Sequence, residues 1–167
     1  MALSIFLEST LNGNGLEETE NSTAITNMGG EDVAAMIEVQ ELSLGIEAAL
    51  EASGRHSVGH HRCLPVTFMC RFGKTSPQFM QGADRNEEFE GTFKLFRNNL
   101  QTGEVESLGT VALSRGRIAG VRMVSPNTLD SDGAGFPTHM VIQLMPHTLT
   151  VTSADGTEAV IDWTQRG

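Results

Sequence analysis

The alternation of apolar and polar side chains over residues 66–72 constrains the fold of this 167-residue chain more than any other stretch. Its apolar face holds Val66, Phe68, Cys70 and Phe72. Its other face holds Thr67, Met69 and Arg71. Because successive side chains of a strand point to opposite faces, this period of two predicts a half-buried β-strand. Phe89, Phe93 and Leu95 alternate again before Arg97, which predicts a second strand.

A short helix is predicted between these two strands. Residues 73–74 interrupt the alternation, Ser76 suits an N-cap, and Pro77 suits the first helical position. Phe79 and Met80 are expected to pack inward, and Gly82 is expected to end the helix.

Residues 33–50 fit two patterns. Ile37 and Val39 share one parity, whereas Leu42, Leu44 and Ile46 share the other. A strand with a β-bulge near residues 40–41 produces that change of face. The alternative is a helix, because the apolar spacing and the helix-forming composition of this segment also suit one. The intrinsic propensity of these residues favours the helix, so the residues alone leave both patterns open.

The remaining chain has further strand patterns separated by loops. Strands are expected at 3–7, 110–124 (with a bulge at Gly116), 140–144, 149–152 and 159–163. Loops are expected at 8–32, 52–62, 98–109 and 125–138. Six to eight strands, one short helix and no repeated βαβ pattern indicate a mainly β, antiparallel barrel or sandwich. We expect residues 1–167 to form a single domain.

The net charge of −10 is concentrated at the N-terminal side. Residues 1–54 contain ten acidic residues and no Lys or Arg, whereas the rest of the chain balances eleven acids with eleven bases. A nucleic-acid-binding protein needs a basic surface, so we expect no nucleic-acid partner. The N-terminal residues have no basic region typical of a signal peptide. No apolar stretch approaches the roughly 20 residues of a membrane span, so no membrane insertion is expected.

Several partial motifs are incomplete. Gly73-Lys74-Thr75 resembles the end of a phosphate-binding P-loop, but Phe68 stands where the first glycine is needed. A dinucleotide motif beginning at Gly13 has Glu18 in place of its third glycine. A calcium loop around residues 130–133 lacks its first and last ligands.

The remaining reactive side chains do not form a complete site. His60, His61 and Cys63 have metal-ligand chemistry, but neighbouring residues of a strand point apart and cannot all bind one ion. Cys63 and Cys70 differ by an odd number of residues, so on one strand they face opposite ways and form no disulfide. We expect no catalytic residues, no cofactor and no metal, and therefore not an enzyme.

An ordered series of segments resembles the Hcp (hemolysin-coregulated protein) family, the tube subunits of the bacterial type VI secretion system. The segments are Pro65-Val66-Thr67-Phe68, Gly73-Lys74, Ser76-Pro77, Leu95-Phe96-Arg97, Ile37-Glu38-Val39, Leu42–Ile46, Leu149–Thr152, Asp155-Gly156 and Asp162-Trp163. The resemblance implies a strand rather than a helix over residues 37–46, and we expect that strand. It also implies a β-barrel that assembles as a homo-hexameric ring, with rings stacked into a hollow tube. It also implies a spike protein, a contractile sheath and effector proteins as partners, and secretion from the cytoplasm without a signal peptide.

Two other functions stay open on sequence alone. One is a tail-tube protein of a phage or a related contractile injection system. The other is a small β-barrel metal-binding protein or enzyme that uses the histidines.

In the resembled family, the extension between the second and third core strands reaches the next ring. The corresponding residues here are Ser53, Gly54, Arg55, His56, Ser57, Val58, Gly59, His60 and His61. Arg55 and Arg62 are the first bases after the acidic third of the chain. We therefore expect this loop to stack rings, in part by pairing with acidic residues of the next ring.

Overall fold

The computed structural model describes residues 3–18, 25–48, 61–132, 135 and 137–163. Within these ranges the chain forms one helix, α1 (Thr75–Asp84), and thirteen strands. The strands are β1 (Leu3–Leu11), β2 (Asn14–Leu16), β3 (Asn27–Met28), β4 (Glu31–Asp32), β5 (Ile37–Ser43), β6 (Ile46–Glu47), β7 (Arg62–Cys63), β8 (Val66–Arg71), β9 (Glu88–Asn98), β10 (Val105–Val124), β11 (His139–Met145), β12 (Thr148–Ser153) and β13 (Glu158–Asp162).

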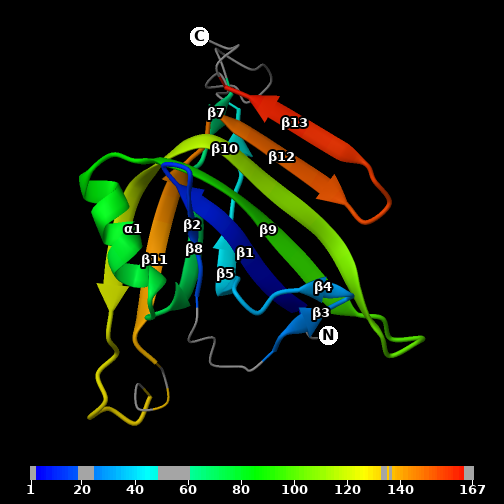
Figure 1. The fold of residues 1–167 in the computed structure, drawn as a ribbon, viewed down its shortest axis with the longest axis horizontal. Helices are drawn as coiled ribbons and strands as arrows, with labels where there is room; N and C mark the ends of the chain where they lie inside the picture. The colour runs from blue at the N-terminus through cyan, green and yellow to red at the C-terminus, as the bar shows by residue number, and fades with distance from the viewer. Residues whose placement is uncertain (1–2, 19–24, 49–60, 133–134, 136, 164–167) are drawn as a thin grey trace, which may run out of the picture.

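The main sheet is entirely antiparallel and closes on itself through β10. Its order is β11-β8-β5-β1-β9-β10-β12-β13, and β11 also pairs with β10 (Figure 1). The first part of β10 pairs with β9 up to Arg117, and the last part pairs with β11 from Arg117 onward. Six strands therefore form a closed ring, and the β12–β13 hairpin extends the sheet beyond it. This confirms the expected mainly β, antiparallel fold, although the strands are more numerous than the six to eight predicted.

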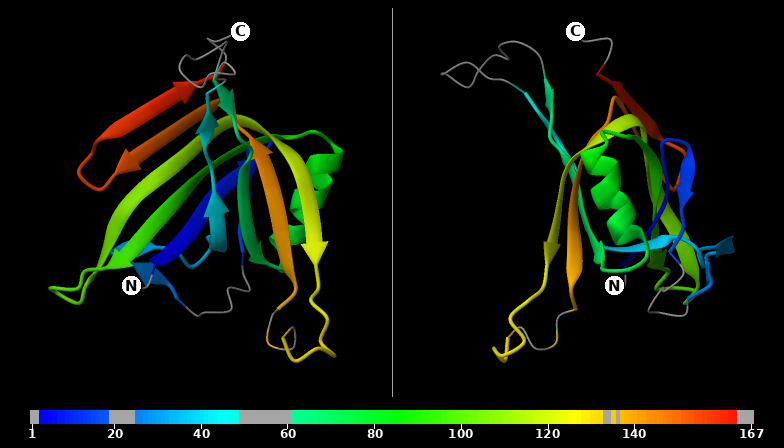
Figure 2. Two further views of the ribbon diagram at one scale, coloured as in Figure 1. Left: turned by 180° about the vertical axis from the view of Figure 1, so that it is seen from behind. Right: turned by 60° about the vertical axis from the view of Figure 1, so that its left-hand side comes forward.

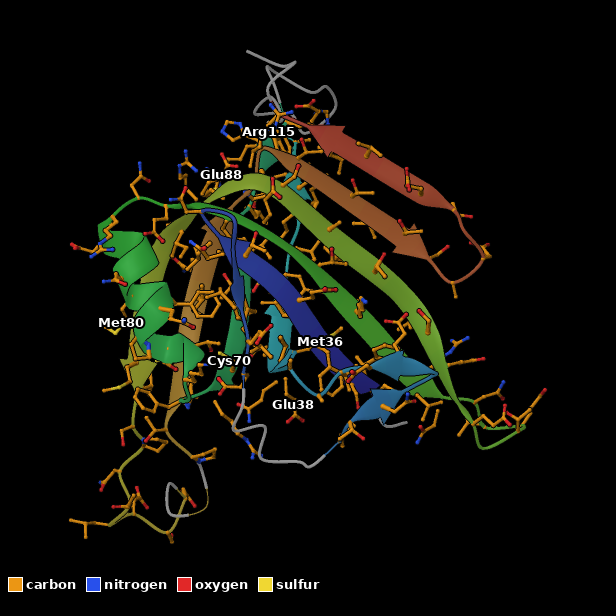
Figure 3. All side chains as sticks on the ribbon, viewed as in Figure 1. Met36, Glu38, Cys70, Met80, Glu88 and Arg115 are labelled. Carbon is orange, nitrogen blue, oxygen red and sulfur yellow. The ribbon has the colours of Figure 1, made fainter. Side chains whose placement is uncertain are left out.

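A bulge lets β10 pair with β9 along its first part and with β11 along its last part. The pairing with β9 shifts between Leu113 and Gly116, which confirms the predicted bulge at Gly116. Arg115 has a φ of 50°, a left-handed conformation that is rare for a residue other than glycine. It lies where β10 bends (Figure 3). A bulge increases the local bend of a strand, so the curvature that closes the ring is concentrated here.

The interior of the ring is filled by apolar side chains from all six strands and from α1. Phe68 is fully buried and makes edge-on contacts with Phe79 of α1 and with Phe93 of β9, with ring centroids 5.8 Å and 5.3 Å apart. Phe79 also contacts Phe89. These aromatic pairs join the two predicted strands and the helix into one packed unit, as the alternation over 66–72 indicated.

A second, smaller core lies on the outer face of β1 and β9. Phe6 and Phe96 contact each other there with ring centroids 6.3 Å apart, and Val33 covers them. Ile5 and Leu7 point into the main core instead. Both faces of β1 are thus buried, which explains why its sequence is a continuous apolar run rather than an alternating one.

The prediction of a loop over residues 8–32 is wrong over much of that range. β1 continues to Leu11 and turns back into β2 through Asn12 and Gly13, which have φ values of 51° and 81°. Asn-Gly is the preferred pair for a two-residue hairpin of this geometry. Gly29 and Gly30 make the same kind of turn between β3 and β4.

Residues 37–43 form the strand expected there, and the alternative helix is wrong. The pairing of β5 with β8 shifts between Val39 and Glu41, which confirms the predicted bulge. Ile37 and Val39 are buried before the bulge, and Leu42 packs against the core after it. Ile46 was expected to share the apolar face of Leu42 and Leu44. It is exposed instead, in the short β6–β7 hairpin.

Helix α1 begins earlier than predicted, and the predicted N-cap residue does not cap it. The N-cap is Lys74, which makes no side-chain cap, and Ser76 is instead buried in the first turn, where its hydroxyl accepts a hydrogen bond from the Gly73 N–H. The buried carboxylate of Glu18 takes the capping role. It accepts hydrogen bonds from the backbone N–H of Lys74 (3.1 Å) and from the N–H and hydroxyl of Thr75 (3.3 and 3.1 Å).

This carboxylate satisfies N–H groups that have no partner inside the helix, and its charge suits the positive end of the helix dipole. A Cβ on Gly73 would lie 2.6 Å from a Glu18 oxygen, so a larger residue would displace the carboxylate from these hydrogen bonds. The stretch that resembles a P-loop therefore holds a carboxylate of its own chain.

Gly82 does not end α1, contrary to prediction. It lies within the helix, where a Cβ would come 2.8 Å from Leu11, so its small size allows α1 to approach β1 closely. The helix ends at Asp84, followed by Asn86 with a φ of 51°. The Asn86 N–H donates to Ala83 O and the Glu87 N–H donates to Gly82 O, which is a Schellman motif.

Two apolar residues expected in the core are exposed. Phe72 is 52% exposed just beyond the end of β8, and Met80 is 49% exposed on the outer side of α1 (Figure 3). Leu95 is half-buried and packs against the core.

Cys63 and Cys70 are both free thiols, as expected. Burial, and then the charge of Glu18, raise the pKa of Cys70 to about 12, so it stays protonated at neutral pH.

Replacing Phe68 with Ala is expected to reduce the free energy of unfolding by about 3–5 kcal/mol, because it removes the ring that contacts both Phe79 and Phe93. Phe72→Ala is the matched control, since that side chain is half exposed. It should change the free energy of unfolding by about 0.5 kcal/mol or less. Urea unfolding followed by circular dichroism measures both. Equal effects of the two substitutions would contradict the assigned core.

Glu18→Gln is expected to reduce the free energy of unfolding by about 1–3 kcal/mol, because the amide keeps the shape but loses the charge that strengthens the three hydrogen bonds. The neighbouring Glu17 is exposed, so Glu17→Gln should change it by about 0.5 kcal/mol or less. The same urea titration compares the two variants, and a Glu18→Gln protein as stable as wild type would show that the carboxylate does not stabilise α1.

Candidate functional site

The predicted stacking loop joins the two strands of the β6–β7 hairpin. Residues 53–60 lie outside the described residues, and His61, the last residue of the predicted loop, is exposed directly before β7. In the stem, Arg62 binds Glu47 across the hairpin with an N–O distance of 2.7 Å. Arg62 is therefore paired within its own chain, and Arg55 remains the base predicted to reach another ring.

The acids of the first third are spread over the molecule rather than gathered at one end. Lys94 of β9 lies 2.9 Å from Glu31 and 3.5 Å from Glu8, so one lysine neutralises part of this segment. The hydrogen bond to Glu31 is the main cause that raises the pKa of Lys94, with partial burial opposing it. Glu18 and Glu47 are engaged at α1 and at the β6–β7 stem.

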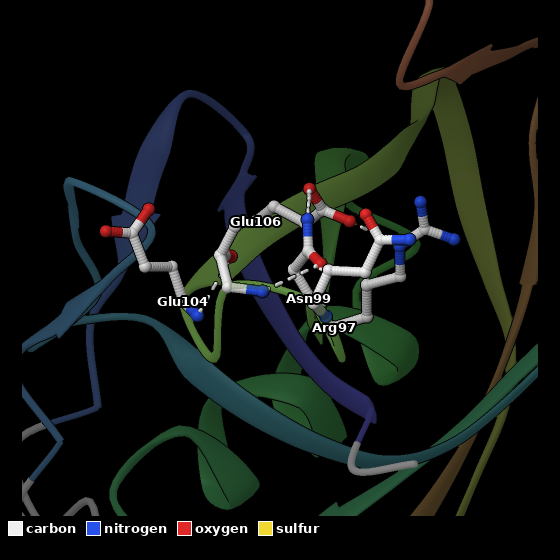
Figure 4. A network of polar contacts seen from close by, with 6 residues as sticks. Arg97, Asn99, Glu104 and Glu106 are labelled. Atoms are coloured by element: carbon white, nitrogen blue, oxygen red, sulfur yellow. Dashed lines mark hydrogen bonds and ion pairs between the residues drawn. The ribbon is translucent and has the colours of Figure 1, made fainter.

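The turn between β9 and β10 is held rigidly by side-chain hydrogen bonds (Figure 4). The Asn99 side chain accepts hydrogen bonds from the N–H groups of Gln101 and Thr102, and donates one to Glu106. Arg97 donates to the same Glu106 carboxylate at 2.9 Å. At the tip of this turn, Leu100 is 83% exposed. A rigid turn that displays an apolar side chain loses little entropy when it docks, so this is a candidate contact surface.

Some strands of the main sheet have an edge without a strand partner within the described residues. β13 pairs only with β12, and β2 pairs only with β1. Residues 120–124 of β10 pair with β11 on one side, and no described strand pairs with their other side. Figure 1 shows this end of β10 beside α1. Free edges present unpaired N–H and C=O groups and favour pairing with another strand.

A hollow of about 240 Å³ lies between the β1–β2 hairpin and residues 32–36. Its lining combines the carboxylates of Glu8, Glu17 and Asp32 with the apolar side chains of Leu16 and Met36. Such a lining suits a basic side chain rather than an anionic substrate.

Within the described ranges, no three His, Cys, Asp or Glu side chains come together as a metal site would require. His139 and His147 are on separate elements, at the start of β11 and just before β12. In the part of the chain that the structure describes, no helix has the length and apolar character needed to cross a bilayer.

The fold was compared with known structures. A crystal structure of an Hcp protein matches with a TM-score of 0.83 at 18% identity, covering 97% of this chain and 98% of that one. The secreted protein Hcp3 from Pseudomonas aeruginosa matches with a TM-score of 0.73 at 18% identity, over 97% of this chain and 99% of that one. Hcp1 from Salmonella typhimurium matches with a TM-score of 0.68 at 13% identity, over 99% and 98%. These matches establish the fold.

The sequence was compared in the same way. A search of curated protein sequences gives no significant match. The family model described as "Type VI secretion system effector, Hcp" matches residues 26–154, well over half of the chain. The resemblance inferred from the short segments is thereby confirmed, and the chain belongs to the Hcp family of the type VI secretion system.

Proposed function

We propose that this protein is the structural subunit of a type VI secretion inner tube, forming hexameric rings that stack and carry or chaperone effectors. The match of the Hcp family model over residues 26–154 is the observation that carries this proposal. The partners of such a subunit are further copies of itself, a spike protein, a contractile sheath and the effectors. In this proposal the protein is made in the cytoplasm and is secreted as part of the tube.

The surface of the molecule supports assembly rather than catalysis. A closed barrel provides a rigid wall, and the strand edges without a partner provide places where further strands can pair. A ring is the assembly in which every such edge is covered, because a cyclic arrangement of identical contacts has no end.

For ring stacking, we retain the loop of residues 53–61 as the contact that reaches the next ring. The stem of this loop and the turn between β9 and β10 lie at opposite ends of the molecule (Figures 1 and 2). The turn presents exposed Leu100 and exposed Glu104. A loop containing Arg55 and Val58 is complementary to that surface in both charge and apolar character.

Light scattering coupled to gel filtration tests the ring. We expect a mass of about six copies of the 18.0 kDa chain, because a closed ring of identical contacts has a fixed number of subunits. A mass of one chain at tens of micromolar would contradict the proposed function.

Deleting residues 54–60, or substituting Arg55→Glu, is expected to leave the ring mass unchanged but to abolish stacking and secretion. Arg55→Lys is the matched control, since it keeps the charge and should stack. Raising the salt concentration should separate stacks before rings, because exposed charges are screened within roughly 3 Å at 1 M salt. Electron microscopy of negatively stained protein distinguishes stacks from single rings. Unchanged stacking by the shortened protein would remove this loop from the stacking surface.

A further inference from the structure

The hollow of about 240 Å³ beside the β1–β2 hairpin has a strongly negative lining. Glu8, Glu17 and Asp32 line it, and no described Lys or Arg does. Lys94 is the one described base that pairs with any of these acids, and it contacts both Glu8, at 3.5 Å, and Glu31, at 2.9 Å. The first third of the chain contains no Lys or Arg, so the segments that build the hollow cannot neutralise it themselves. The hollow therefore carries uncompensated negative charge.

A gap in the pairing of β1 creates this hollow. One edge of β1 pairs with β5 through Leu7 and with β2 from Ser9 onward, so the two neighbouring strands separate at Glu8. Beyond the gap, the Glu18 N–H donates to Ala35 O at 3.0 Å and joins the two walls. The Glu18 carboxylate is itself held at the start of α1. Because both walls are anchored, the hollow is present without a ligand, as binding sites for small molecules usually are.

Ser9 supplies an unused hydrogen-bonding group in the lining. It is only 5% exposed, and its hydroxyl has no hydrogen-bond partner among the described residues. A buried hydroxyl without a partner costs free energy, so it requires an explanation. A ligand in the hollow that donates a hydrogen bond to the Ser9 oxygen provides one.

The rest of the lining is apolar. Leu16 is buried, and Met36, just before β5 (Figure 3), is half-buried with a flexible side chain that adapts to an irregular ligand. A primary ammonium group has three N–H donors, no acceptor and a positive charge, which matches the carboxylates and the Ser9 oxygen. An alkyl stem on that ammonium matches the apolar part. A bare metal ion fits less well, because no three metal-ligating side chains come together in the described residues.

We propose that this hollow binds a primary ammonium group on an unbranched alkyl stem, carried by a free alkylamine or by a lysine of another protein. The ammonium lies among the carboxylates and donates to Ser9, and the stem packs against the apolar side chains. The residues that make these contacts are Glu8, Ser9, Leu16, Glu17, Asp32 and Met36. The site goes beyond the proposed tube function and does not depend on the assembly of rings.

Isothermal titration calorimetry of the full chain at low ionic strength tests the site, with butylammonium chloride as the probe. We expect saturable binding of one butylammonium per chain. Methylammonium has the same charge without the stem. Affinity should fall by roughly two- to fourfold for each methylene removed, because the apolar part of the lining covers the stem.

Two substitutions test the polar contacts. Glu17→Gln should weaken butylammonium binding about three- to fivefold. Glu158→Gln is the matched control, because it removes the same charge from an exposed position on β13, and it should change the affinity less than about twofold. Ser9→Ala should weaken binding about tenfold, because the ammonium loses an acceptor in a buried place. Thermal unfolding confirms that the three variants are folded.

Nuclear magnetic resonance of the methionine methyl groups locates the bound amine without any substitution in the lining. The Met36 resonance should shift during the titration with butylammonium. The Met123 resonance should stay in place, because Met123 is near the end of β10 and does not line the hollow.

A second probe, Nα-acetyl-lysine amide, distinguishes the two sources of the ammonium group. If it binds as well as butylammonium does, the hollow admits a lysine side chain held in a polypeptide. If only butylammonium binds, the ligand is a free amine.

Each remaining outcome decides the proposal. Selective weakening in Glu17→Gln and Ser9→Ala, together with a shift of the Met36 resonance, supports it. The proposal is overturned if butylammonium shows no saturable binding, if Glu17→Gln and Glu158→Gln weaken binding equally, if Ser9→Ala binds as wild type does, or if the Met36 resonance does not move.

Discussion

The fold depends on one strand that hydrogen-bonds at both ends of the same sheet. β10 pairs with β9 along its first part and with β11 along its last part, and the bulge at Arg115 and Gly116 turns it from one neighbour to the other. Because one continuous strand makes both pairings, the barrel closes around an interior packed with aromatic rings from strands distant in sequence. The same arrangement leaves the far side of residues 120–124 without a strand partner among the described residues, at the flank opposite β13.

Helix α1 illustrates how local chemistry serves this closure. It joins β8 to β9, packs Phe79 into the barrel and approaches β1 closely at Gly82. Its first N–H groups are satisfied by Glu18, which comes from the segment after β2. Glu18, which stands in place of the third glycine of a dinucleotide motif, therefore has a structural role. Its partner stretch, Gly73 to Thr75, resembles a phosphate loop because both bind oxygen anions through backbone N–H groups.

The fold class was predictable from the sequence where one face of a strand is buried. The alternation over residues 66–71 and the phase change near Gln40 located β8 and the bulge in β5. The strand expected at residues 3–7 is confirmed as the first part of β1, and only its continuation over residues 8–11, where polar side chains interrupt the apolar run, was missed. Asn-Gly is a typical sequence for a two-residue hairpin turn, so the turn at Asn12-Gly13 could have been predicted. The composition of residues 8–32 indicated a loop instead. Glu18 and the free edge of β10 were not predictable, because both depend on contacts between residues far apart in the chain.

The central claim of the proposed function is that this barrel assembles into a closed ring. Electron cryomicroscopy of the purified protein tests it most directly. The account predicts rings with six-fold symmetry. Single subunits, or particles without rotational symmetry, would contradict it.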